Sequence, residues 1–398
     1  MTKNAQQTPQ QIEWTSTMHG NSAPSGIVVA HAGADALRVN PRGFTREQRE
    51  EIEALGLSDG ATRSIGAGNR AREEEPDPFR TCFERDRDRI LHASAFRRLA
   101  GKTQVFIFPE DHQRTRLTHA IEVAQVATAI ARTLGLNVAL AEAIALGHDC
   151  GHGPGGHASE DAFSPYVEGG YHHAVWGADV SLAPLNLCAE TLDGVRNHSW
   201  SRPAPITPEG EVVAWADRFA YCTADLDDAI HARLVSIDDL PSAVTRLLGG
   251  RQSQQINTLV TALIQCTEAN GVVGLDADHA EALAALRSFN YERVYSRAES
   301  QAQAESVTAV LHALVEFFIE NTALLPDGYL PEGCLDATNR PPRQVRATAA
   351  VAYVSGMTDR FAFGSAVELI DWPTEKLPVG FDLRLFARDD AYDLAITA

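Results

Sequence analysis

Two histidines and two aspartates lie in three stretches of this sequence that have helical periodicity. His119 is near the start of the first stretch, and the adjacent pair His148 and Asp149 ends the second. Asp217 is near the start of the third. Imidazole and carboxylate together are the ligands of divalent metals such as Mn, Fe, Co, Ni and Zn. With no cysteine pair nearby, the sequence predicts a four-ligand metal centre of the catalytic kind.

The helices that carry the two histidines must turn them toward the core. In the first helix an apolar stripe recurs at helical spacing, and His119 lies one turn before Val123 on that stripe. In the second helix Leu140, Ile144 and His148 are four residues apart, so His148 also points inward. A buried imidazole needs partners for its nitrogens. A backbone carbonyl can serve one histidine, whereas two inward histidines followed by a carboxylate favour a metal.

A glycine-rich loop, Gly151 to Gly156, follows the His-Asp pair, and small residues let a backbone approach an ion or anion closely. After it, His157 and Glu160 are three residues apart at the start of another predicted helix. A carboxylate beside an imidazole fixes its tautomer and raises its basicity, as a proton-transfer histidine requires. The alternative is that Glu160 only stabilises the N-terminus of the helix by its charge.

Other polar residues flank the predicted ligands at helical spacing. Arg116, one turn before the first ligand, could reach an anion bound to the metal, although a surface salt bridge is the alternative. In the third helix Asp217, Tyr221 and Asp225 are each four residues apart. One acid could close the metal shell, while Tyr221 and Asp225 could hydrogen-bond and stack on a sugar. Arg218 adds a cation beside them.

The composition limits the class of protein. With 398 residues, few aromatics and long stripes of helical period, the chain is expected to be mostly α-helical. The net charge of -19 argues against an extensive nucleic-acid surface, because neutralising phosphates requires clustered Lys and Arg. The sequence contains no stretch of about 18 apolar residues, so no membrane span is expected. Six scattered cysteines without CxxC spacing predict reduced thiols and a cytoplasmic location.

Three regions are expected along the chain. Residues 1–75, rich in small and polar residues, are expected to form a partly disordered N-terminal arm with one short helix. Residues 76–300 are expected to form the catalytic core. This core opens with RDRDRILHASAFRRL, whose charges form either a solvated salt-bridged face or a contact to a polyphosphate or another subunit. Residues 301–398 are expected to form a mostly helical region that packs on the core.

Five ordered blocks and one short motif carry a resemblance to a known family. The blocks are RDRDRILHASAFRRLAGKTQVF, DHQRTRLTHAIEVAQVA, AIALGHDCGHGPGGHASE, LDGVRNHSW and ADRFAYCTADLDDAI, and the motif near the end is VSGMTDRFAF. Together they resemble the bacterial deoxynucleoside triphosphate triphosphohydrolases, the dGTPase-like branch of the HD-domain superfamily. The resemblance implies an all-α fold, with an HD-domain helical core, an additional C-terminal helical region and little β structure.

The resemblance also implies an activity. Proteins of this kind hydrolyse dGTP or several dNTPs at the α-phosphate and release a deoxynucleoside and inorganic triphosphate. One divalent ion per subunit is implied, commonly Mg or Mn, with Fe, Co, Ni or Zn as alternatives. A homo-oligomer is implied as well. Two alternatives stay open: an HD phosphohydrolase that acts on another nucleotide, and a nucleotide-sensing protein of low turnover.

Roles follow from the resemblance position by position. The implied metal ligands are His119, His148, Asp149 and Asp217. His157 with Glu160 is the implied acid–base dyad beside the α-phosphate. The implied substrate contacts are Arg116, Arg218 and His173 at the phosphates, Gln104 near the sugar and base, and Tyr221 and Asp225 beneath the deoxyribose.

Two segments depart from the pattern of the family. The loop after the His-Asp pair usually reads approximately HPPFGH, whereas here it runs from His152 through two consecutive glycines to His157. Glycine makes a loop less restrained, so we expect a looser loop here. A polar run usually follows the pocket histidine, whereas this chain has Ala174, Val175, Trp176 and Gly177. Neither departure changes a predicted metal ligand.

Overall fold

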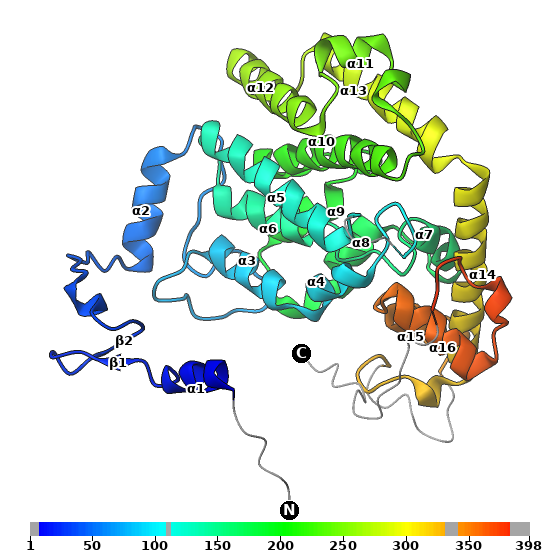
Figure 1. The fold of residues 1–398 in the computed structure, drawn as a ribbon, viewed down its shortest axis with the longest axis horizontal. Helices are drawn as coiled ribbons and strands as arrows, with labels where there is room; N and C mark the ends of the chain where they lie inside the picture. Colours follow the sequence, from blue (N-terminus) through cyan, green and yellow to red (C-terminus); the bar gives the residue numbers. More distant parts are fainter. Residues whose placement is uncertain (1–7, 109–112, 331–340, 383–398) are drawn as a thin grey trace, which may run out of the picture. The chain divides into compact units, whose positions relative to one another are not determined.

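The computed structural model describes residues 8–108, 113–330 and 341–382, and the regular secondary structure of these residues is almost entirely helical (Figure 1). The helical fraction is 62%, and the only strands among these residues are β1 (Asn21–Ser22) and β2 (Val28–Val29). The predicted all-α fold class with little β structure is therefore confirmed. The chain divides into two compact units, Met1–Thr45 and Arg46–Ala398.

The first unit is small and has little core. Its helix α1 (Pro9–Ser16) begins after Thr8, whose hydroxyl accepts the N–H of Gln11 at 3.2 Å. The strands β1 and β2 then pair antiparallel, and a 3₁₀ turn, Ala34–Ala36, follows. Ala23 is the one buried apolar side chain among the described residues of this unit.

The second unit holds the helices that position the predicted site residues. Local signals set their ends: Gly135, with φ of +64°, follows α5 in the left-handed conformation, and Asn137 accepts the N–H of Leu140 at 3.1 Å to begin α6. Up to His231, the helices are α2 (Arg46–Gly56), α3 (Cys82–His92), α4 (Ser94–Arg98), α5 (Arg116–Thr133), α6 (Val138–Gly147), α7 (Ala158–Phe163), α8 (His173–Trp176), α9 (Ala189–Asn197) and α10 (Pro208–His231).

Six further helices follow among the described residues, with short 3₁₀ and π turns between elements of the unit. The helices are α11 (Ser242–Leu247), α12 (Gln252–Asn270), α13 (Ala277–Asn290), α14 (Ala298–Glu320), α15 (Arg343–Ser355) and α16 (Asp359–Ile370). The 3₁₀ turns are Leu99–Gly101, Ser164–Tyr166, Ala183–Leu185, Ile237–Asp239, Thr322–Leu324 and Thr374–Lys376. The π turns are Gly177–Ser181 and Tyr291–Tyr295.

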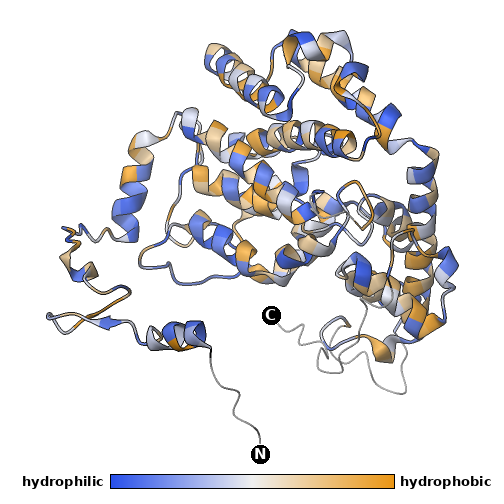
Figure 2. Ribbon diagram, in the orientation of Figure 1, coloured by the Kyte–Doolittle hydropathy of each residue, from blue (hydrophilic) through white to orange (hydrophobic). Residues whose placement is uncertain are grey.

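Two hydrophobic clusters hold this unit together. The first is built by α3, α5, α6, α10 and the helices up to α13, and its centre is α6, in which Leu140 and Ile144 are fully buried. Figure 2 shows apolar residues concentrated in α5 and α6, whereas α2 is largely hydrophilic. The second cluster joins α7 and Trp176 to α14, α15 and α16. The C-terminal helices therefore share a core with the segment that follows the glycine-rich loop.

Two stretches differ from their sequence-based interpretation. The apolar run Thr103–Phe108, which reads as strand-like, forms no strand and makes a single bridge, Thr103 to Thr115. Among the described residues the only strands are β1 and β2, which pair with each other and not with this run. Residues 46–75, expected in the arm, belong to the second unit. There Arg70 forms a 2.6 Å ion pair with Asp86, and both side chains are buried.

The charges of α3 meet partners within the chain. Arg80 pairs with Asp77 and Asp88, and Arg89 pairs with Glu74 at 2.8 Å. This arrangement matches the salt-bridged face of the two interpretations of this helix. Among the described residues α14 is the one helix long and apolar enough to span a membrane, but it contributes to the second cluster. The described cysteines are free, and Cys334 lies outside the described residues.

Candidate active site

A cavity of about 610 Å³ lies between α5, the glycine-rich loop, α10 and residues 287–304. Nearly all the predicted site residues line it, namely Gln104, Arg116, His119, Asp149, His157, His173, Asp217, Arg218, Tyr221 and Asp225. His148 and Glu160 stand behind this lining and contact it, since His148 approaches Asp217 and Glu160 holds His173. Side chains that are far apart in the sequence therefore meet at one hollow.

The predicted metal ligands converge at one end of the cavity. His119 Nε2 lies 3.0 Å from Asp217 Oδ1, so α5 and α10 meet there. His148 Nε2, at the end of α6, is 3.5 Å from Asp149 Oδ1 and 3.7 Å from Asp217 Oδ1. Ligand atoms of His119, His148 and Asp217 all lie within 4.8 Å of one another, and the same holds for His148, Asp149 and His198.

The chemistry of these donors fits a cation. His148 Nδ1 donates to the Ala145 carbonyl at 2.6 Å, so its Nε2 carries a free lone pair and has no hydrogen-bond partner among the described residues. Although burial opposes ionisation, Arg116 and the neighbouring histidines hold the pKa of Asp149 well below its usual range. Burial also opposes the charge of Asp217, but the hydrogen bond from His119 lowers its pKa. A buried carboxylate and a partly buried one that both stay ionised, together with a lone imidazole nitrogen, suit a divalent metal.

Arg116 is buried beside the predicted ligands. Its Nη1 donates to Asp149 Oδ2 at 2.7 Å, and the two side chains are 3% and 4% exposed. The alternative interpretation of Arg116 as part of a surface salt bridge is therefore wrong. Its Nε and Nη2 are buried and have no hydrogen-bond partner among the described residues. A buried guanidinium that lines a cavity with free donors is equipped to bind an anion there.

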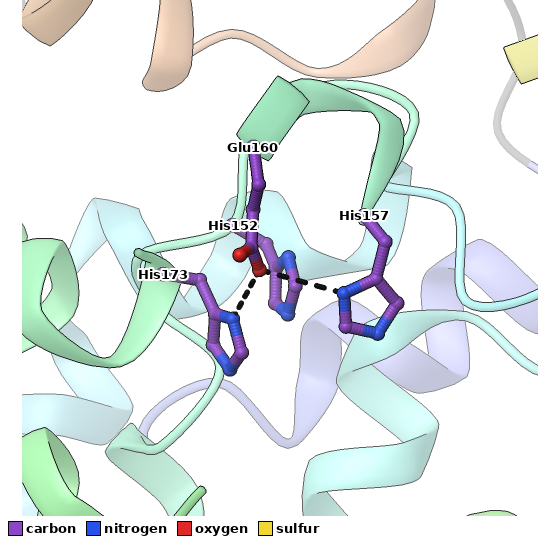
Figure 3. Close-up of side chains that lie close together, drawn as sticks. All are labelled: His152, His157, Glu160 and His173. Carbon is purple, nitrogen blue, oxygen red and sulfur yellow. Dashed lines mark hydrogen bonds and ion pairs between the residues drawn. The ribbon is translucent and has the colours of Figure 1, made fainter. Parts of the chain in front are cut away.

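Glu160 holds two histidines, His157 and His173, as Figure 3 shows. Its Oε1 lies 2.5 Å from His173 Nδ1 and 3.4 Å from His157 Nδ1. Burial opposes its charge, but hydrogen bonds from both histidines lower the pKa of Glu160 strongly. The ionised carboxylate keeps each Nδ1 protonated and leaves each Nε2 for other partners. The sequence paired Glu160 with His157, whereas its closer partner is His173.

Two more histidines, His152 and His198, contact His173. The ring of His152 stacks on that of His173 with centroids 3.8 Å apart and planes 14° apart. His152, His157, Glu160 and His173 are close enough to hold an ion. However, the ring planes of His152 and His173 are nearly parallel, so their lone pairs do not converge on one point. His198 Nε2 lies 3.2 Å from His173 Nε2, a contact the sequence missed because His198 has no helical spacing to the other site residues.

The far end of the cavity is built by α10 and residues 287–304. Arg218 lies over the Trp200 ring, 3.4 Å from its centroid. Arg287 Nε donates to the Tyr221 hydroxyl at 3.0 Å, and the Tyr295 hydroxyl donates to Asp225. Burial raises the pKa of Asp225 to about 7. Sequence reasoning missed Trp200, Arg287 and Tyr295, because no spacing connects them to the ligands.

Comparison with known proteins identifies the family. Residues 116–222 match the HD domain, and residues 273–366 match a phosphohydrolase-associated domain. A deoxyguanosinetriphosphate triphosphohydrolase-like protein of Caldanaerobacter subterraneus is 41% identical over 324 residues, which span 80% of this chain and 93% of that protein. The chain belongs to this family of HD-domain proteins. A namesake in Clostridium perfringens is 38% identical over 331 residues (79% and 94%), and one in Desulfatibacillum aliphaticivorans is 35% identical over 351 residues (83% and 98%).

Membership of this HD-domain family supports a phosphohydrolase that acts on nucleotides. The cluster of His119, His148, Asp149 and Asp217 falls inside the matched HD segment, and HD domains are metal-dependent. The second matched segment contains Arg287 and Tyr295, so both parts of the family pattern contribute side chains to the cavity.

Proposed function

We propose that this protein is a metal-dependent deoxynucleoside triphosphate triphosphohydrolase. The substrate is dGTP or several dNTPs, and the products are a deoxynucleoside and inorganic triphosphate. One observation carries the proposal: the predicted ligands His119, Asp149 and Asp217 line the cavity, with His148 directly behind them, and the same cavity presents Arg116, Arg218 and the row of Tyr221 and Asp225. Cation, phosphate and sugar sites in that order fit a nucleotide attacked at its innermost phosphate.

The proposed ligands of the metal are His119, His148, Asp149 and Asp217. A divalent ion bound there, Mg or Mn in the first instance, supplies Lewis-acid polarisation of a phosphoryl oxygen. Arg116 holds Asp149 and keeps two free donors for the α-phosphate region. Arg218 offers a second cation at the cavity wall. A triphosphate carries several negative charges, and these guanidinium groups stabilise it within a chain whose net charge is -19.

Glu160, His157 and His173 manage the proton in this proposal. The oxygen of a water forms a bond to the α-phosphorus, and the bond from that phosphorus to the 5′-oxygen breaks. The water gives up one proton, and the leaving 5′-oxygen takes one. Because Glu160 fixes Nδ1 of both histidines, the Nε2 of His157 is available for these transfers, whereas that of His173 already contacts His198. His157, with a side chain 75% exposed on the cavity wall, is the proposed catalytic member of the pair with Glu160.

Tyr221 and Asp225 form the proposed platform for the deoxyribose. Arg287 and Tyr295 hold their polar atoms in place, so the platform is rigid. A sugar packed closely against the Tyr221 ring leaves no room for a 2′-hydroxyl, and Asp225 can bond the 3′-hydroxyl. Gln104 has a buried Oε1 without a partner among the described residues and is the proposed contact to sugar and base. A homo-oligomer, implied by the resemblance, and a cytoplasmic location, predicted from the scattered cysteines, stay expectations.

Product analysis tests the proposal. The protein is incubated with each dNTP and with Mg or Mn, and all products are separated by chromatography. We expect deoxynucleoside and inorganic triphosphate in equal amounts. Orthophosphate or pyrophosphate alone would point to an HD phosphohydrolase with another cleavage site, and tight dNTP binding without any product would point to a nucleotide sensor. Either outcome contradicts the proposal.

A further inference from the structure

We infer that Asp359, at the first position of α16, is a positioning residue for the reaction, because its carboxylate ties the glycine-rich loop to the segment that carries Gln104. The inference rests on the proposed function for what it positions. It concerns a residue that does not itself line the cavity but bonds two residues that do, Thr103 and Gly155.

The Asp359 carboxylate accepts three hydrogen bonds from two separate segments. Its Oδ2 accepts the N–H of Thr103 at 3.0 Å and the hydroxyl of Thr103 at 2.5 Å. Its Oδ1 accepts the N–H of Gly155 at 2.8 Å. The residue is 3% exposed, so water does not compete for these bonds. Bonds to a buried charged acceptor are stronger than those between neutral groups.

The two segments held in this way have little structure of their own. Thr103 directly precedes Gln104, and its regular backbone pairing is a single bridge, to Thr115. Gly155 lies two residues before His157 and has φ of +72°, in the left-handed region that suits glycine. Because this loop has glycines where the family has bulkier residues, we expected it to be looser. In the structure other segments restrain it: Asp359 accepts the N–H of Gly155, and α14 lies so close that a Cβ at Gly155 would meet Val307 at 2.4 Å.

A second contact ties the turn before α16 to the same loop. Lys102 is buried, and its Nζ donates to the carbonyls of His152 at 2.5 Å and Ser355 at 2.9 Å. The indole of Trp176 donates to the Ser355 hydroxyl at 3.1 Å. The segment from Ser355 to Asp359 therefore holds both ends of the glycine-rich loop, near His152 and near His157. A shift of about 1 Å in a catalytic group can cost about 10²-fold in rate.

The chain offers a matched control for Asp359. Glu209, in α10, is also buried and accepts two backbone N–H groups and one threonine hydroxyl, from Thr62 and Asn137. It does not line the cavity. Asp359→Asn and Glu209→Gln each replace a carboxylate by an amide, whose N–H₂ then faces a donor. Both variants are expected to melt at a lower temperature than the wild type. Only Asp359→Asn should also displace the glycine-rich loop and the segment that carries Gln104.

The experiment compares these two variants with the wild type, well below their melting temperatures. For Asp359→Asn we expect kcat to fall about 10- to 100-fold, with the KM changed less than about threefold and the metal content per chain unchanged. For Glu209→Gln we expect kcat within about twofold of the wild type. Equal kcat values for the two variants would overturn the inference, as would loss of metal from Asp359→Asn.

Two further measurements keep the inference testable on its own. Hydrogen exchange should become faster in residues 151–157 and 102–108 of Asp359→Asn and stay unchanged there in Glu209→Gln; unchanged exchange in both overturns the inference. If the wild type releases no inorganic triphosphate, the proposed function fails, and exchange alone decides the positioning role. If Asp359→Asn does not fold, Thr103→Val takes its place, because it loses one of the three bonds, with Thr103→Ser as the control. We expect a lower kcat for Thr103→Val than for Thr103→Ser, and equal kcat values would overturn the inference.

Discussion

His119 and Asp217 come from different helices and meet at 3.0 Å, so the loss of either should leave the remaining ligands too few to hold an ion. We expect His119→Ala and Asp217→Ala to lose bound metal and turnover together. Metal per chain is measured by elemental analysis after gel filtration. His279→Ala, at a partly exposed histidine outside the cavity, is the control and should keep both. Stoichiometric metal in either ligand variant would remove that residue from the ligand set.

The two histidines on Glu160 give a different kind of prediction. Glu160→Gln keeps the size of the side chain but no longer fixes the protonated Nδ1 atoms of His157 and His173 by charge. We expect it to retain the metal and to lose about 10²- to 10⁴-fold in kcat, the usual contribution of acid–base catalysis. His157→Ala should do the same. Turnover within twofold of the wild type would assign these residues to structure.

Asp225 should make the stability of the fold depend on pH. Burial raises its folded-state pKa to about 7, above the ordinary value of 3.8. Between these values the folded chain holds a proton that the unfolded chain releases, so the stability falls as the pH rises through this window and the cost is complete above pH 7. Asp225→Asn removes this cost, by at most about 4 kcal/mol at 1.36 kcal/mol for each tenfold change in proton affinity.

Melting temperatures of Asp225→Asn and the wild type, recorded in a chelator from pH 5 to pH 8, measure this effect. The variant should gain on the wild type as the pH rises. A difference that stays constant over this range would show that Asp225 titrates as an ordinary carboxyl. We expect Asp225 to lower the stability of the fold, because its buried position beneath the proposed sugar site favours binding and not folding.

At the scale of elements, the sequence predicted the helices but only part of the cavity. The ends of α5 and α6 at Gly135 and Asn137 are local signals, and the structure has them where they were expected. The apolar stripe of α5 differs at Ile121, which helical spacing assigned to the buried face and which is 52% exposed. The wall that contains Arg287 and Tyr295 depends on how α13 packs against α10 and on the bond from Tyr295 to Asp225, and no periodicity in one sequence encodes those contacts. The same holds for His198 and for Asp359, whose partners are far away along the chain.

The glycine-rich loop allows a test at this scale. Gly155 and Gly169 have similar backbones, with φ of +72° and +79°. A Cβ at Gly155 would meet Val307 at 2.4 Å, whereas nothing lies within 4 Å of one at Gly169. Both alanine variants should bear about 1–2 kcal/mol of left-handed strain. Only Gly155→Ala should also push the loop from α14 and lower kcat, by at least about tenfold.

Gly169→Ala serves as the control for strain in that comparison, and kcat and the free energy of unfolding are measured for both. If the two variants lose the same stability and keep the same kcat, the loop does not depend on its contact with α14. Val307→Ala combined with Gly155→Ala should restore part of the loss, because it makes room for the new methyl group.

At the scale of the whole molecule, the two parts of the second unit contribute different chemistry. The HD segment supplies the predicted ligands, while the C-terminal helices share a core with α7 and bond the glycine-rich loop. The net charge of -19 argued against an extensive nucleic-acid surface, but it gave no indication that several arginines line the cavity. A sum of charges carries no position, and only the fold brings Arg116, Arg218 and Arg287 to one hollow.

The first unit gives the last prediction. Met1–Thr45 forms its own compact unit, and Ala23 is the one buried apolar side chain among its described residues, so it has little core to contribute. The second unit holds both hydrophobic clusters and the whole cavity. We therefore expect a chain without residues 1–44, which keeps the residue before α2, to retain its metal and a kcat within about twofold, with Tm lowered by less than about 2 °C. A longer deletion, of residues 1–56, is the matched contrast. It also removes α2 and with it the ion pair of Arg49 with Glu84, so we expect it to lower Tm further. Loss of activity in the shorter deletion would show that the first unit takes part in the site.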